Sequence, residues 1–123
     1  MNKILIVEDD HNLGLMIKDI LEFQGYEIEL SKKPEETIEN LKTKNIDLVL
    51  IDKLMSGIDG TDVCREIRNT EGISDIPVLM MSALHEVREE CIAAGATDFI
   101  YKPFEINVLH EKVRNIIKQE KSI

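Results

Sequence analysis

Residues 48–52 read LVLID, four apolar residues followed directly by an aspartate. An apolar run that does not alternate with polar residues predicts a strand buried on both faces, as in parallel sheets covered by helices. Residues 4–7, ILIV, form a second run of this kind and lead into Glu8, Asp9 and Asp10. The two runs predict central strands of one parallel sheet, each followed by acidic residues.

Outward from these runs, short apolar segments alternate with amphipathic segments along the whole chain. Further strands are expected at 26–30, 78–81 and 99–101, with helices between successive strands and after the last one. The first helix is predicted from apolar residues at helical spacing, which are Leu13, Met16, Ile17, Ile20 and Leu21. We also expect Met16, Met80 and Met81 to fill the core.

This alternation predicts an α/β fold with a five-stranded parallel sheet, doubly wound with helices on both faces. Residues 26–30 alternate apolar and charged side chains, so this second strand belongs at an edge of the sheet. An edge position favours the flavodoxin-like strand order 2-1-3-4-5. The length of 123 residues, without a linker-like segment, indicates a single domain over residues 1–123.

The composition excludes several classes of function. The chain has 24 Asp and Glu residues against 15 Lys and Arg residues, a net charge of -9, which would repel nucleic acid and anionic membranes. Cys64 and Cys91 are expected to be reduced and partly buried, without a disulfide framework. The N-terminus does not resemble a signal peptide and no apolar run could span a membrane, so the cytoplasm is the expected location.

The residues just beyond the strand ends are expected to carry the chemistry. In an open parallel sheet, ligands bind beyond the carboxyl ends of the strands where the strand order reverses, here between the first and third strands. Glu8 and Asp9 follow the first strand, and Asp52 follows the third. Ser82 follows the fourth strand and Lys102 the fifth. Asp10, the third acid in its row, is expected to cap the next helix instead.

Carboxylates gathered at one point repel one another, and a divalent cation removes that cost. Mg²⁺, or Mn²⁺ in its place, takes oxygen ligands and needs only one or two carboxylates beside waters and phosphate oxygens. An aspartate beside such a cation can attack phosphorus and carry the phosphoryl group as an acyl phosphate. The cation, the Lys102 ammonium and the Ser82 hydroxyl would then stabilise the charge on the phosphoryl oxygens.

Five motifs occur together: ILIVEDD at 4–10, LVLID at 48–52 with GIDG at 57–60, Ser82-Ala83, GATDF at 95–99, and Lys102-Pro103-Phe104. Each is weak alone, but all five occur in this order, each at a strand end. The chain thus resembles the receiver domain of bacterial two-component response regulators over nearly its whole length. The resemblance implies a signalling switch and not a metabolic enzyme. Its phosphodonor would be a sensor histidine kinase or a phosphotransfer protein.

The resemblance also implies roles for the acidic residues. Asp52 is similar to the aspartate that accepts the phosphoryl group. Asp9 resembles the direct ligand of the metal ion, and Glu8 resembles the acid that reaches the metal through water. Asp52 and the main-chain carbonyl of Leu54 would complete the protein ligands.

Further roles implied by the resemblance concern the switch. Ser82 matches the hydroxyl residue that contacts the phosphoryl group, and Lys102 matches the lysine that pairs with the phosphorylated site. Phe99 matches the aromatic residue that swings inward as the Ser82 loop closes, and the bond between Lys102 and Pro103 is expected to be cis. Phosphorylation would remodel the face made by the last helices and strand, where a downstream target, an attached output domain or a second copy could bind.

The sequence departs from the family pattern in three places. Ser56 stands where many receivers have proline, and Lys53 adds a positive charge beside Asp52. The stretch from Ser82 to Lys102 is about two residues shorter than in many relatives, which we place in the loop before the fourth crossover helix. None of these departures removes a catalytic group.

Three alternative functions share parts of this pattern. A degenerate receiver would only bind a partner, although all the expected site residues are present. An Mg²⁺-dependent phosphohydrolase with an aspartyl nucleophile would need a second acid two residues later, where Leu54 stands. A flavodoxin-like electron carrier would need a loop that cradles phosphate, and the acids at 8–10 would repel that group.

Overall fold

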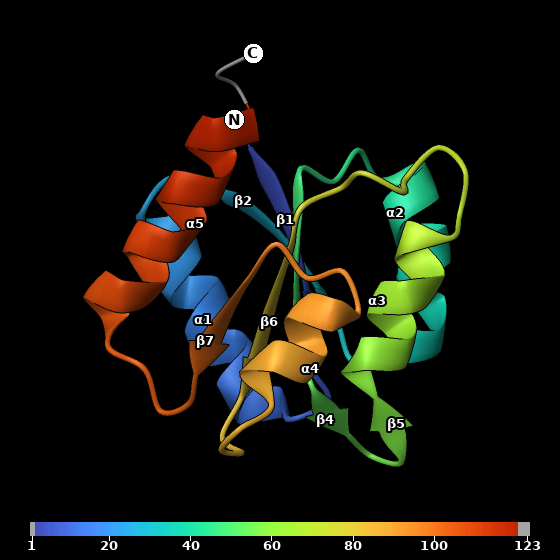
Figure 1. Ribbon diagram of the computed structural model, residues 1–123. Coiled ribbons are helices and arrows are strands. Elements are labelled where there is room, and N and C mark those ends of the chain that lie inside the picture. The colour runs from blue at the N-terminus through green and yellow to red at the C-terminus, as the bar shows by residue number, and fades with distance from the viewer. Residues whose placement is uncertain (1, 121–123) are drawn as a thin grey trace.

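A computed structural model describes residues 2–120 of the chain. Its main sheet has five parallel strands in the order β2-β1-β3-β6-β7 (Figure 1). These strands are β1 (Lys3–Val7), β2 (Glu27–Ser31), β3 (Leu48–Asp52), β6 (Val78–Ser82) and β7 (Asp98–Tyr101). Counting only these strands, the order is the predicted 2-1-3-4-5, with the half-exposed second strand at an edge.

Helices cover both faces of the sheet, as the alternating pattern predicted (Figure 1). The helices are α1 (His11–Phe23), the 3₁₀ helix η1 (Pro34–Glu36), α2 (Thr37–Thr43), α3 (Gly60–Arg68), α4 (Arg88–Ala93) and α5 (Ile106–Glu120). Side chains of α1 and α5 pack on one face of the sheet. Side chains of α2, α3 and α4 pack on the other face. None of these helices is long and apolar enough to cross a membrane, among residues 2–120.

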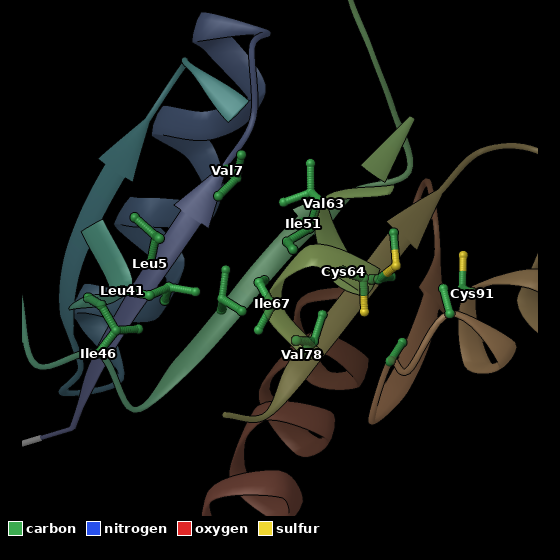
Figure 2. Packing of buried hydrophobic residues seen from close by; sticks show 14 of the residues in the cluster. Leu5, Val7, Leu41, Ile46, Ile51, Val63, Cys64, Ile67, Val78 and Cys91 are labelled. Atoms are coloured by element: carbon green, nitrogen blue, oxygen red, sulfur yellow. The ribbon is translucent and has the colours of Figure 1, made fainter. Parts of the chain in front are cut away.

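The core consists of two apolar layers, one on each face of the sheet. Alternate residues of β1 and β3 enter opposite layers, because successive side chains of a strand point to opposite faces. Figure 2 shows one layer, to which Leu5, Val7 and Ile51 of the sheet, Cys64 of α3 and Cys91 of α4 all belong. Both cysteines are free of disulfide bonds, as expected, and they are fully buried where partial burial was expected. This double burial explains the unbroken apolar runs at 4–7 and 48–51.

Met16 does not fill the core, which corrects the sequence prediction. Its side chain is 48% exposed on α1, whereas Met80 and Met81 are fully buried in the sheet. The next residue, Ile17, is buried together with Leu21. A helix that covers one face of a sheet buries only one stripe of side chains, and Met16 lies beside that stripe.

The segment after β3 contains a small hairpin that the sequence pattern did not reveal. Strands β4 (Leu54–Met55) and β5 (Ile58–Asp59) pair antiparallel and enclose a two-residue turn at Ser56 and Gly57. Gly57 adopts a φ of 73°, the left-handed region that glycine reaches without strain. The hairpin lies at the lower end of the sheet in Figure 1 and leads directly into α3.

Candidate functional site

The expected site residues lie at the carboxyl end of the central strands. Asp52 ends β3 and is 4% exposed, while Glu8 follows β1 and is 1% exposed. The register pairs Val7 of β1 with Ile51 of β3, so Glu8 and Asp52 leave neighbouring strands at the same level. Two carboxyl groups are therefore buried side by side at the point where the strand order reverses.

Lys102 brings a positive charge to both carboxyl groups. Its Nζ atom lies 2.8 Å from Oδ2 of Asp52 and 3.7 Å from Oε1 of Glu8. The residue before it, Tyr101, pairs with Ser82, and this register carries Lys102 to the carboxyl end of the sheet. The peptide bond between Lys102 and Pro103 is cis, as the resemblance implied. An ammonium group thus neutralises part of a buried acid pair.

Glu8 remains the least satisfied group of the site. Its buried Oε1 atom has no hydrogen-bond partner. Burial, followed by a hydrogen bond with Asp52 and the charge of Asp52, raises the pKa of Glu8 to about 8, although Lys102 acts against this shift. Glu8 therefore holds a proton near neutral pH when no cation is present. A buried carboxyl oxygen that accepts no hydrogen bond, beside a second carboxylate, is a donor set that fits a divalent cation.

Asp9 adopts a different environment from its neighbour. Its Oδ2 atom accepts hydrogen bonds from the main-chain N of Ser56 at 2.7 Å and from the Ser56 hydroxyl at 2.5 Å. These two bonds hold the pKa of Asp9 below its usual value. The Asp9 carboxylate thus contacts the hairpin turn. Within residues 2–120, no three or more acidic, histidine or cysteine side chains are gathered closely enough to hold a metal ion.

Asp10 caps the helix that follows the acidic row. Its side chain accepts a hydrogen bond from the main-chain N of Leu13 at 3.0 Å and forms the N-cap of α1. The sequence prediction that Asp10 caps the next helix is confirmed.

The hairpin segment packs closely against Asp52. The main-chain N of Leu54 donates to Oδ1 of Asp52 at 3.3 Å, while the Leu54 side chain is 60% exposed. A Cβ atom at Gly60 would lie 2.3 Å from the main-chain O of Asp52, so only glycine fits there. In the sequence, Gly60 appears only as the last residue of the GIDG motif, and the contact between Ser56 and Asp9 had no sequence signal at all.

Ser82 and Phe99, the two residues expected to move in the switch, are both buried. The Ser82 side chain is 1% exposed, and its hydroxyl accepts a hydrogen bond from the main-chain N of Leu84 at 3.0 Å. In the part of the chain that the structure describes, no hydrogen bond joins this hydroxyl to Asp52. Phe99 is 2% exposed, and its ring meets the exposed Tyr101 ring edge to face at 4.7 Å between centroids.

The positive charge that Lys53 adds beside Asp52 is paired with two carboxylates. Its Nζ atom lies 3.0 Å from Oδ2 of Asp59 and 3.3 Å from Oε1 of Glu90. Hydrogen bonding to Asp59 is the main cause that raises the pKa of Lys53, with Glu90 acting in the same direction. Two carboxylates therefore compensate this charge.

The sequence matches the response regulator receiver domain family over residues 4–114. The chain belongs to this family. It is 33% identical over 118 residues to the probable transcriptional regulator ycf27 of Cyanidium caldarium, covering 94% of this chain and 46% of the relative. It is 32% identical over 119 residues to the response regulator MprA of Mycolicibacterium vanbaalenii, covering 95% of this chain and 51% of the relative. The chain spans about half the length of these curated relatives.

Solved receiver structures have the same fold. A putative response regulator from Chloroflexus aurantiacus superimposes with a TM-score of 0.90 at 31% identity, covering 95% of this chain and 98% of that one. The receiver domain of a sensor histidine kinase from Pseudomonas aeruginosa has a TM-score of 0.86 at 28% identity, with coverages of 95% and 98%. That structure has a magnesium ion coordinated in its active-site cleft.

Proposed function

We propose that this receiver domain is a phosphorylation-dependent switch in which Asp52 accepts a phosphoryl group. The observation that carries the proposal is the buried pair of Asp52 and Glu8, with the Lys102 ammonium 2.8 Å from Asp52. The donor would be a sensor histidine kinase or a phosphotransfer protein. The domain would catalyse its own phosphorylation and dephosphorylation, and act as a regulator and not as a metabolic enzyme.

The transfer begins with the Asp52 carboxylate, one oxygen of which attacks the phosphorus of a phosphohistidine. The new O–P bond forms an acyl phosphate as the P–N bond breaks, and the imidazole leaves with the electron pair of that bond. Lys102, already within hydrogen-bond distance of Asp52, stabilises the added negative charge, and the Ser82 hydroxyl donates to a phosphoryl oxygen after it moves inward. Hydrolysis of the acyl phosphate by water resets the switch.

The residues present fit a divalent cation, Mg²⁺ or Mn²⁺, which would neutralise charge between carboxylates and phosphoryl oxygens. Asp9, Asp52 and the main-chain carbonyl of Leu54 would be its direct ligands, and Glu8 would reach it through water. The buried Oε1 atom of Glu8, which has no hydrogen-bond partner, supports this assignment. Asp9 would have to exchange its bonds with Ser56 for the cation.

Phosphorylation would shift a pre-existing equilibrium between two arrangements of the Ser82 loop and Phe99. The resulting change at the face of α4, β7 and α5 would reach a downstream target, an attached output domain or a second copy in a homodimer. The acidic composition supports a domain that does not itself contact nucleic acid or membrane. We place its activity in the cytoplasm, where histidine kinases and their phosphodonors act.

The decisive test is an intact-mass measurement after incubation with Mg²⁺ and acetyl phosphate. We expect one phosphoryl adduct, which disappears in Asp52→Asn and in a sample treated with chelator. Asp10→Asn is the matched control, because it makes the same chemical change two residues from Glu8 and asparagine still caps a helix. It should keep the adduct.

Other outcomes point to different functions. An adduct that persists in Asp52→Asn would place the nucleophile elsewhere. A folded protein that binds Mg²⁺ but gains no adduct from acetyl phosphate or a phosphorylated kinase would be a degenerate, partner-binding receiver. Rapid multiple turnover of a phosphorylated metabolite would indicate a phosphohydrolase instead.

A further inference from the structure

The side chain of Lys53 joins three elements next to the proposed phosphoacceptor. It projects from the residue after β3, and its ammonium contacts Asp59, the N-cap of α3, and Glu90 of α4. The Lys53 side chain is 11% exposed and the Glu90 side chain is 46% exposed. One largely buried lysine side chain therefore ties the end of β3 to both helices.

The main chain of Lys53 is fixed on both sides. Its N donates to the carbonyl O of Met81 at 2.8 Å, and its carbonyl O accepts from the main-chain N of Gly60 at 2.6 Å. Asp59 is fixed as well, because its other carboxylate oxygen accepts from the main-chain N and hydroxyl of Thr61. The partner that can yield is Glu90 on α4, the six-residue helix drawn in orange in Figure 1.

Movement of Ser82 would reach α4 through a short segment. Only residues 83–87 separate Ser82 from the first residue of this helix. The Ser82 hydroxyl now accepts from the main-chain N of Leu84 and makes no described bond to Asp52. In the proposed switch, Ser82 moves inward to donate to a phosphoryl group on Asp52, and the short segment would carry this movement to α4. The ion pair of Lys53 and Glu90 opposes that displacement.

We propose that Lys53 is a positioning residue that restrains α4 in the arrangement of the unphosphorylated protein and thereby weakens the affinity of the site for a phosphoryl group. This inference rests on the proposed function, because it presupposes phosphorylation at Asp52. An interaction that is stronger in one of two states shifts the equilibrium toward that state. Loss of the pair should therefore favour the phosphorylated arrangement.

The direction of the change in affinity for a phosphoryl group distinguishes a restraint on α4 from a simple electrostatic effect of the two charges. The positive charge of Lys53 attracts a phosphoryl group and the negative charge of Glu90 repels it, so a field effect gives opposite changes in Lys53→Met and Glu90→Gln. A restraint gives the same change in both, because either substitution breaks the same ion pair.

The test measures the affinity of the full chain for beryllofluoride, a phosphoryl mimic, by ¹⁹F NMR titration with Mg²⁺ present. Lys53→Met and Glu90→Gln should each bind it about two- to fivefold more tightly than wild type, the range for a half-exposed ion pair. The double variant should gain no more than either single variant. Lys53→Arg keeps the charge and should stay near wild type.

The matched control is Glu89→Gln, which removes an equal charge from an exposed residue of α4 that has no ion pair among the described residues. It should leave the affinity unchanged. The inference is overturned if the affinity for beryllofluoride changes in opposite directions in Lys53→Met and Glu90→Gln, or if it falls or stays the same in both. An equal gain in affinity in Glu89→Gln would also overturn it. If the folded wild type binds no beryllofluoride, the proposed function fails; if it binds and only the expected pattern is missing, the inference alone fails.

Discussion

Substitution of Glu8 by glutamine should make the metal-free protein more stable, and increasingly so as the pH rises. Glu8 is buried against Asp52, and its pKa rises from 4.5 to about 8 on folding. Between these two values the folded state holds a proton that the unfolded state has released. Folding stability therefore falls with rising pH across this window, because the folded state binds more protons than the unfolded state. Glutamine resembles the protonated acid and carries no such dependence.

The size of the effect follows from the pKa shift. Each pKa unit corresponds to about 1.4 kcal/mol, so the shift sets a ceiling of about 5 kcal/mol, reached only above the folded pKa of about 8. Between about pH 5.5 and about pH 7.5, the free energy of unfolding of Glu8→Gln should rise relative to wild type by about 2–3 kcal/mol. Mg²⁺ should reduce this difference, because a cation stabilises the ionised form of Glu8.

The assay is urea unfolding of both proteins in chelator at several pH values, repeated with Mg²⁺. Taking the difference between variant and wild type cancels the titration of groups that both proteins share. Glu89→Gln serves as the control for removal of an exposed carboxylate from the same chain. Parallel curves for wild type and Glu8→Gln across this pH range would refute the reasoning, since they would show that folding does not perturb Glu8.

Three further substitutions test other contacts. Gly60→Ala should lower the free energy of unfolding by about 1–3 kcal/mol and reduce phosphoryl uptake, because the new Cβ would meet the main-chain O of Asp52. Unchanged phosphoryl uptake, measured by intact mass, would contradict this. Arg68→Ala should cost about 2–3 kcal/mol in urea unfolding, because the guanidinium donates to three main-chain carbonyls, and Arg68→Lys should recover only part of the loss. Lys102→Met should destabilise the metal-free protein by about 1–3 kcal/mol at alkaline pH, with Mg²⁺ restoring most of it; equal losses with and without Mg²⁺ would contradict the role of Lys102 as counter-charge.

Much of the fold could be predicted because its signals are local. The unbroken apolar runs at 4–7 and 48–51 require burial on both faces, which only a sheet between helices provides. The alternation at 26–30 correctly placed the second strand at the edge. The hairpin at 54–59 was missed, because two-residue strands are too short to show a period of two.

Most of the site could also be predicted, from the residues that directly follow the strands. Because parallel strands end at one edge, the sequence placed Asp52 and Glu8 with Lys102, and the structure joins all three by contacts within 3.7 Å. The positions of the strand ends do not predict the contact of Ser56 with Asp9 or the close packing of Gly60 against Asp52. Both contacts depend on how the hairpin folds back. Segments that approach through a loop leave no periodic signal.

The sequence by itself determined the five strands of the main sheet, the strand order and the residue types at the carboxyl edge, because hydrophobic periodicity and strand ends are properties of consecutive residues. Only the tertiary structure decided what each of these side chains meets. The pKa values of two adjacent acids shift in opposite directions. Burial against Asp52 raises the pKa of Glu8, while hydrogen bonds from Ser56 lower the pKa of Asp9. Likewise, only the structure shows that the charge of Lys53 is paired with Glu90. Long-range neighbours set desolvation and charge pairing, and neither can be derived from spacing along the chain.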